Sequence, residues 1–131
     1  MDNRNIYTTA ALLICLLFSN MLLADGDYWR KKPRSGEVKF KSYNITKEEI
    51  VKSAIDVVIQ NNWVITEHTE NDFIAVYIDR VKLKVSFTDD SVLLEEIPAS
   101  LKFEKRWMKS LEKNIDQKFQ YYHYVRLMTS N

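Results

Sequence analysis

The side chains best suited to chemistry lie around the first histidine of the chain. His68 is followed by Glu70 and Asp72 and preceded by Glu67. On a strand, His68 and Glu70 would project from the same side, where an imidazole and a carboxylate could share a metal ion. Two ligands do not complete a metal site, so the pattern favours a surface histidine at a strand end. We predict no metal and no cofactor.

Paired carboxylates are the second route to catalysis. A small hydrolase would need two carboxylates to converge in one pocket with raised pKa values. The candidates are Glu67, Glu70, Asp72, Asp79, Glu95 and Glu96. Glu95 and Glu96 are adjacent in a predicted strand and would point to opposite faces, which weakens that pair. A carboxylate-dependent enzyme therefore stays an alternative.

Several common kinds of active site are excluded by composition. Gly26 and Gly36 are the two glycines of the chain, so the glycine-rich loops that hold phosphates and the G-x-S-x-G turn of serine hydrolases cannot form in the rest of it. The single cysteine, Cys15, lies in an apolar stretch, which leaves no thiol nucleophile elsewhere. We predict that the protein is not an enzyme.

Binding residues are predicted at two places. Arg80 follows one predicted strand, and Lys82 and Lys84 share the polar face of the next, where the three cations would form a small basic surface for an anion or a partner. The alternative for Arg80 is an ion pair with Asp79 or with a carboxylate of the last helix, Glu112 or Asp116. The second place is the aromatic run that contains Tyr121, Tyr122, His123 and Tyr124, which could stack on a partner or form the edge of the core.

The first 24 residues differ from the rest of the chain. Residues 6–24 carry no charge and are mostly apolar, and Ala24 is followed by Asp25 and Gly26, which suits signal peptidase cleavage. We predict export, with the protein in the periplasm or attached to a membrane. An uncleaved N-terminal membrane anchor, with the domain facing the cytoplasm, is the alternative, because cations follow the stretch closely.

Residues 25–41 are polar, contain both glycines and Pro33, and are predicted to form a basic tether. Four of its cations could contact anionic headgroups: Arg30, Lys31, Lys32 and Arg34. A solvated linker explains the same residues. The whole chain carries 19 Lys+Arg against 18 Asp+Glu, so its overall charge gives no indication of a nucleic-acid partner.

The remaining elements follow from residue periodicity. Thr46 and Glu49 are spaced as a capping box ahead of a helix that ends near residue 62. Residues 63–69, 73–78, 81–87 and 91–97 are predicted strands separated by short turns, and residues 73–78 are apolar enough to be buried on both sides. Apolar residues from Trp107 to Tyr122 recur at helical spacing.

This order predicts an α+β domain over residues 42–127. A single antiparallel meander of about four strands should carry two helices on one face, one helix before the strands and one after them. Residues 128–131 would form a short C-terminal tail.

Particular residues in this order resemble a group of small uncharacterised bacterial envelope proteins that are commonly classed as lipoproteins. The likeness lies in residues 45–50, 62–65, 74–76, 80, 85–87, 100–103 and 107–115. Two positions depart from the group, which usually has glycine at the place of Asn62 and often histidine at the place of Val81. The resemblance implies an exported helix–meander–helix domain and no activity. We therefore expect a non-enzymatic binding or accessory module that contacts another envelope protein.

Overall fold

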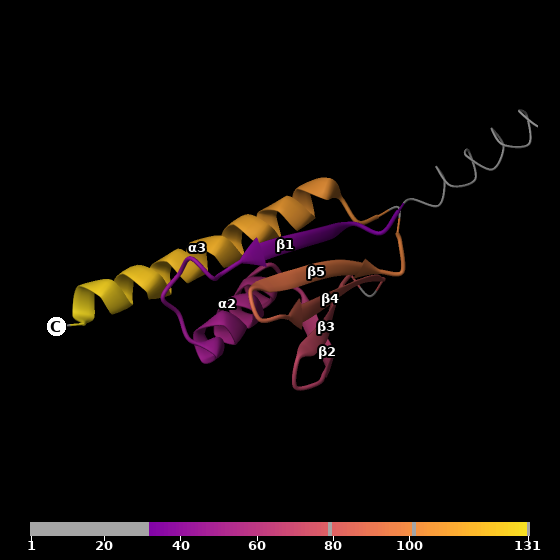
Figure 1. Ribbon diagram of the computed structural model, residues 1–131. Coiled ribbons are helices and arrows are strands. Elements are labelled where there is room, and N and C mark those ends of the chain that lie inside the picture. The colour runs from indigo at the N-terminus through magenta and orange to yellow at the C-terminus, as the bar shows by residue number, and fades with distance from the viewer. Residues whose placement is uncertain (1–31, 79, 101, 131) are drawn as a thin grey trace, which may run out of the picture. The chain divides into compact units, whose positions relative to one another are not determined.

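A computed structural model describes residues 32–78, 80–100 and 102–130 (Figure 1). It confirms the α+β class, with an antiparallel sheet of five strands rather than four. The elements are β1 (Ser35–Lys39), α2 (Lys47–Gln60), β2 (Val64–His68), β3 (Asp72–Tyr77), β4 (Val81–Phe87), β5 (Ser91–Ile97) and α3 (Lys105–Thr129). The strand order is β1-β5-β4-β3-β2, so β2 to β5 form the predicted meander and β1 is added at its edge.

Strand β1 lies in the stretch that the sequence indicated as a tether. It pairs antiparallel with β5, with Val38 opposite Val92 and Gly36 opposite Leu94. Gly36 has a specific role, since a Cβ there would lie 2.8 Å from Cδ of Glu112 in α3. In the sequence, the glycine and its polar neighbours indicated a linker. In the structure, they suit an edge strand covered by a helix, because glycine allows the close approach of α3 and polar residues are common on edge strands.

Helix α2 begins and ends as its sequence predicts. The Glu49 N–H donates to the Thr46 hydroxyl oxygen at 3.2 Å, and the Thr46 N–H donates to Glu49 Oε1 at 2.8 Å, which completes the capping box. At the other end Asn62 has φ 68°, and the N–H groups of Asn62 and Trp63 donate to the carbonyls of Ile59 and Val58. This is a Schellman motif with asparagine in the position that glycine usually occupies.

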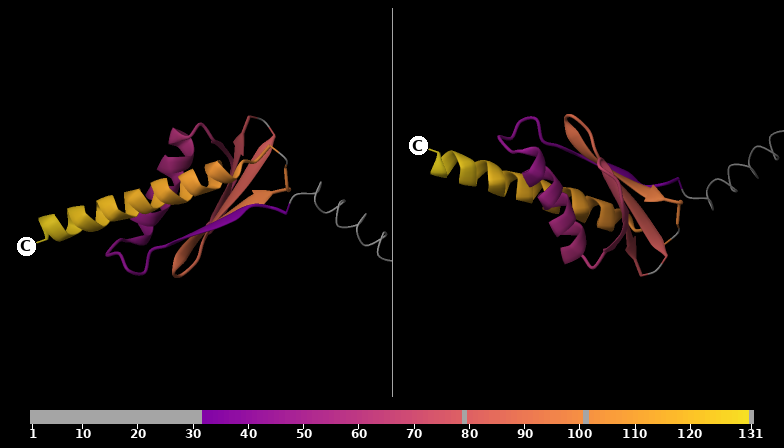
Figure 2. Two further views of the ribbon diagram at one scale, coloured as in Figure 1. Left: turned by 90° about the horizontal axis from the view of Figure 1, so that it is seen from above. Right: turned by 90° about the horizontal axis from the view of Figure 1, so that it is seen from below.

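Both helices cover one face of the sheet and leave the other face open (Figure 2). On the covered face, alternate residues of the strands are buried: Val38, Phe73, Ala75, Val81, Leu83, Val85, Val92 and Leu94. Alternate residues of β3 point the other way, so Ile74 and Val76 are half-exposed. The prediction that residues 73–78 are buried on both sides is therefore wrong, because no layer covers the second face within the described part of the chain.

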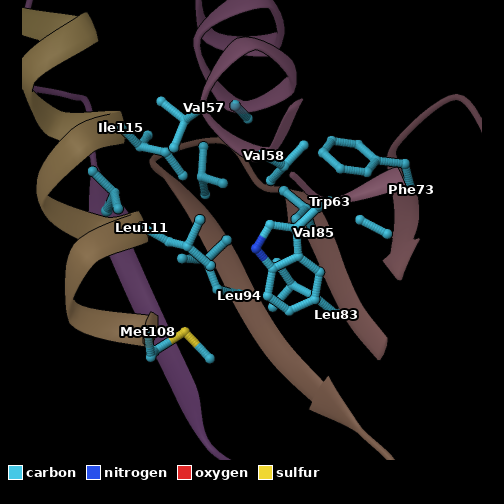
Figure 3. Close-up of a cluster of buried hydrophobic side chains, with 14 of the residues drawn as sticks. Val57, Val58, Trp63, Phe73, Leu83, Val85, Leu94, Met108, Leu111 and Ile115 are labelled. Atoms are coloured by element: carbon cyan, nitrogen blue, oxygen red, sulfur yellow. The ribbon is translucent and has the colours of Figure 1, made fainter. Parts of the chain in front are cut away.

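The core lies between the sheet and the two helices (Figure 3). Helix α3 contributes Met108, Leu111, Ile115 and Phe119, which recur every three or four residues along one side. Helix α2 contributes Val57 and Val58, and Trp63 closes the core beside them. Helix α3 runs past the sheet to Thr129, beyond the domain end at 127 predicted from the sequence.

No helix within residues 32–78, 80–100 and 102–130 is long and apolar enough to cross a membrane. The predicted signal peptide or anchor over residues 1–24 lies outside the described residues, as do residues 25–31 of the predicted tether.

Candidate functional site

Two of the three cations predicted to form a basic surface, Lys82 and Lys84, lie on the open face of the sheet. Lys84 is opposite Glu95 on β5, and its Nζ lies 4.0 Å from Oδ2 of Asp72. Lys82 lies on the same open face between Val76 and Ile97. Lys84 thus has acidic neighbours, and Lys82 has apolar ones. The open face is a mixed surface rather than a basic one.

Arg80 lies in the exposed turn between β3 and β4, two residues before Lys82. Of the ion-pair partners expected from α3, Asp116 instead accepts the hydroxyl of Tyr43 at 2.8 Å, and Glu112 lies against Gly36. Asp79 lies outside the described residues. Among the residues that are described, Arg80 forms no ion pair.

The turn that holds Arg80 also holds a strained residue. Ile78 has φ 53°, a left-handed conformation that costs a β-branched residue about 1–2 kcal/mol. Its side chain is 68% exposed, so no packing interaction in the described chain compensates for that conformation. Unfavourable backbone conformations with an exposed apolar side chain are typical of contact sites.

The aromatic run near the end of α3 divides between two sides of the helix. Tyr121 and Tyr124 are 61% and 57% exposed, whereas Tyr122 and His123 are half-buried. With Val125 and Met128, the two exposed tyrosines recur at i, i+3, i+4 and i+7, and we call these four residues the α3 stripe. A helix turns by about 100° per residue, so the stripe lies on the side opposite the core residues Met108 to Phe119.

Sequence reasoning identified Tyr121 and Tyr124 but missed Val125 and Met128. The helical spacing that relates them was visible in the sequence. The sequence does not show which side of the helix packs on the domain, so this spacing could not be assigned to an exposed face.

The opposite side of this helix end is fixed to the segment before α2. Arg126 forms an ion pair with Glu49, and its Nε donates to the Asn44 carbonyl at 3.1 Å. The Asn44 N–H donates to Nδ1 of His123 at 2.8 Å. Burial and the hydrogen bond to Asp116 raise the pKa of Tyr43. The contacts of Arg126 and His123 hold the α3 stripe in a defined direction.

Electrostatics at Glu49 favour its ionised form. Burial acts to raise the pKa of Glu49, but the N–H of Thr46 and the guanidinium of Arg126 outweigh it and lower the pKa below its ordinary value. The ion pair is thus charged on both sides at neutral pH.

His68 and two of the candidate carboxylates do share a groove. A groove of about 290 Å³ between α2 and the β2–β3 hairpin is walled by apolar side chains, and His68, Glu70 and Asp72 lie at its rim. Oδ1 of Asp72 accepts the Thr69 hydroxyl at 2.8 Å, which gives this carboxylate a part in the turn. No three His, Cys, Asp or Glu residues of the described chain are placed to hold a metal ion.

Glu95 and Glu96 point to opposite faces of β5, as predicted. Glu95 is exposed, whereas Glu96 is 3% exposed and accepts the N–H groups of Arg34 at 2.9 Å and Ser100 at 2.7 Å. Arg34 also donates from Nε to the Phe103 carbonyl at 2.8 Å. Arg34 is therefore part of the folded domain, whereas Lys32 is exposed and Arg30 and Lys31 lie outside the described residues.

A second cleft, of about 270 Å³, was not predicted. It lies where α2 ends and is walled by Trp63, Tyr77 and Trp107, with Asn61 and Asn62 among its polar lining. Tyr77 packs against both indoles, with ring centroids 5.3 Å from Trp63 and 5.1 Å from Trp107. Its residues come from separate elements, so no local motif could have indicated it.

These surfaces define a small α+β domain with exposed apolar residues along the end of α3, in the β3–β4 turn and, at Ile59 and Val64, where α2 ends and β2 begins. No protein-family model matches the chain, and neither a curated protein nor a solved structure was found to be similar to it.

Proposed function

We propose that this protein is a non-enzymatic binding module of the bacterial cell envelope that contacts another envelope protein through the α3 stripe. The observation that carries the proposal is the direction of that stripe. Its four apolar side chains lie opposite the core, on a helix end fixed by Arg126 and His123. Exposed apolar groups in a contiguous row are typical of protein contacts.

The partner surface that fits the stripe is another helix. Residues at i, i+3, i+4 and i+7 form a straight ridge about 10 Å long, which is the unit that packs into the groove of a neighbouring helix. Tyr121 and Tyr124 would supply rigid aromatic contacts with a polar tip, a residue type enriched in interfaces.

Site-specific crosslinking in cells tests this proposal. A photoreactive benzoylphenylalanine placed at Tyr124 should crosslink to one protein, to be identified by mass spectrometry. The same group placed at Lys52, which is exposed on α2, should not. Met128→Lys should abolish the crosslink from position 124. A crosslink to a second copy of the chain, or equal crosslinking from both positions, would refute a helical partner protein.

The proposed location is exported, either periplasmic or attached to a membrane. The alternative is a domain that faces the cytoplasm on an uncleaved anchor. Intact mass and fractionation of the natively expressed protein separate them. A chain that begins at Asp25 or Asp27 in the periplasmic fraction supports cleavage, and a full-length mass in the membrane fraction supports an anchor.

A small carboxylate-dependent enzyme is the second candidate, because Glu70 and Asp72 line one groove with His68. It predicts hydrolysis of ester or glycoside substrates that is lost in Glu70→Gln and kept in Glu95→Gln. Equal rates for these two variants and the wild type would exclude it.

A further inference from the structure

Cations gather at one end of the folded domain. The β3–β4 turn, the connection from β5 to α3, the start of α3 and the start of β1 all lie at this end (Figures 1 and 2). Among the described residues the exposed cations there are Arg80, Lys82, Lys102, Lys105, Arg106 and Lys109. We call them the basic end.

Few acids balance the basic end. Glu104 is exposed and paired with Arg106, and Glu96 is buried beneath two backbone N–H groups. Asp79 adds one acid to this part of the sequence. Since the whole chain has a net charge of only +1, the remainder of the molecule must carry the compensating negative charge. The domain is thus electrically polarised, although its total charge is near zero.

The cations in the first turn of α3 do not stabilise the helix. It contains Lys105 and Arg106 and no acid, and Glu104 caps it without a side-chain hydrogen bond. Cations at a helix N-terminus oppose the helix dipole. A local arrangement that weakens the fold is expected where function requires it.

We propose that the basic end rests on an anionic lipid surface and inserts Ile78 between the headgroups. The exposed cations supply the electrostatic attraction, and Ile78 supplies the apolar contact. The sequence supports lipid over other polyanions, because only residues 25–31 separate the apolar stretch that ends at Ala24 from Lys32.

This inference rests on the proposed place of the protein beside a membrane but not on its protein partner. The α3 stripe lies toward the far end of α3 (Figure 1). Lipid would then be contacted at one end of the helix and protein near the other. The two proposals use different residues and can fail separately.

The experiment uses the full chain with Cys15→Ser, labelled with an environment-sensitive fluorophore at Ile78→Cys. A second labelled chain carries Lys102→Cys, in case the first variant does not fold, and Met128→Cys marks the far end. Each is mixed with phosphatidylcholine vesicles, with or without phosphatidylglycerol. We expect an emission at 78 and 102 that is several-fold higher with the anionic vesicles than with the neutral ones, loss of that difference at high salt, and no such difference at 128.

Two matched charge variants locate the interaction. The first variant, Lys102→Gln/Lys105→Gln/Lys109→Gln, should abolish the rise at position 78. The control variant is Lys39→Gln/Lys41→Gln/Lys47→Gln, which removes the same charge from exposed lysines near the other end of β1. The control should leave the rise unchanged. Equal effects of the two variants, an equal response to neutral vesicles, or a rise at 128 that matches that at 78 would overturn the proposal. So would variant-sensitive binding to duplex DNA without binding to vesicles.

Discussion

Arg126, near the end of α3, forms an ion pair with Glu49, the residue that completes the capping box of α2. One carboxylate therefore stabilises the start of one helix and fixes the end of the other. Because Tyr121, Tyr124 and Met128 lie within this end of α3, the ion pair also determines where the α3 stripe points.

The lowered pKa of Glu49 predicts a specific pH dependence. Its ordinary value is 4.5, and its folded value is lower, so its contribution to stability is fully present above pH 4.5 and is lost as the pH falls through the folded pKa. Glu49→Gln should therefore lower the free energy of unfolding by about 1 kcal/mol at neutral pH and by less near pH 3. Urea unfolding at the two pH values measures this, and an equal loss at both would contradict it.

Glu96 should be far more important to stability than its neighbour Glu95. Glu96→Ala removes the carboxylate that accepts the half-buried N–H groups of Arg34 and Ser100 and should cost about 1–3 kcal/mol. Glu95→Ala removes an exposed side chain and should change stability by about 0.5 kcal/mol or less. Chemical unfolding of the two variants tests the pair, and similar losses would show that Glu96 is not the attachment point of the chain before β1.

The orientation of α3 can be checked with two aromatic residues that are two positions apart. Phe119 is fully buried, whereas Tyr121 is 61% exposed. Phe119→Ala should lower the free energy of unfolding by about 3–5 kcal/mol. Tyr121→Ala should lower it by about 0.5 kcal/mol or less. If Tyr121→Ala proves as destabilising as Phe119→Ala, the stripe packs within the protein and cannot be a contact surface.

The two left-handed residues should respond to glycine in the same direction. Asn62→Gly and Ile78→Gly each remove a side chain that a positive φ disfavours, and we expect gains of a few tenths of a kcal/mol at Asn62 and about 1 kcal/mol at Ile78. The gain at Ile78 matters because the same substitution should weaken binding to anionic vesicles. A variant that is more stable but binds less cannot be explained by unfolding.

Local signals predicted those elements that depend on neighbouring residues. The capping box located α2, and the alternation of Val81, Leu83 and Val85 located β4. Strand β1 was not predicted, because its residues are polar and glycine-containing and its pairing with β5 depends on contacts distant in sequence. The burial of residues 73–78 on both sides was overpredicted, since an apolar run alone does not tell how many layers cover a sheet.

The candidate surfaces were predicted only in part. Tyr121 and Tyr124 stood out by residue type, but their exposure depends on which side of α3 packs on the core. Lys82 and Lys84 stood out by alternation, but the acidic neighbours of Lys84, Glu95 and Asp72, come from other strands. The basic end combines residues from two separated segments, and a chain with balanced overall charge gave no indication of it.

The most direct test of the central claim is the affinity of the partner identified by crosslinking for variants of the α3 stripe. Calorimetric titration should show that Tyr121→Ser/Tyr124→Ser weakens binding by roughly 2 kcal/mol or more, about a thirtyfold loss in affinity. The control, Lys113→Ser/Gln117→Ser, changes two exposed polar residues on the same helix and should leave the affinity unchanged. Equal affinities for both variants would contradict the proposed function, whatever other surfaces the protein uses.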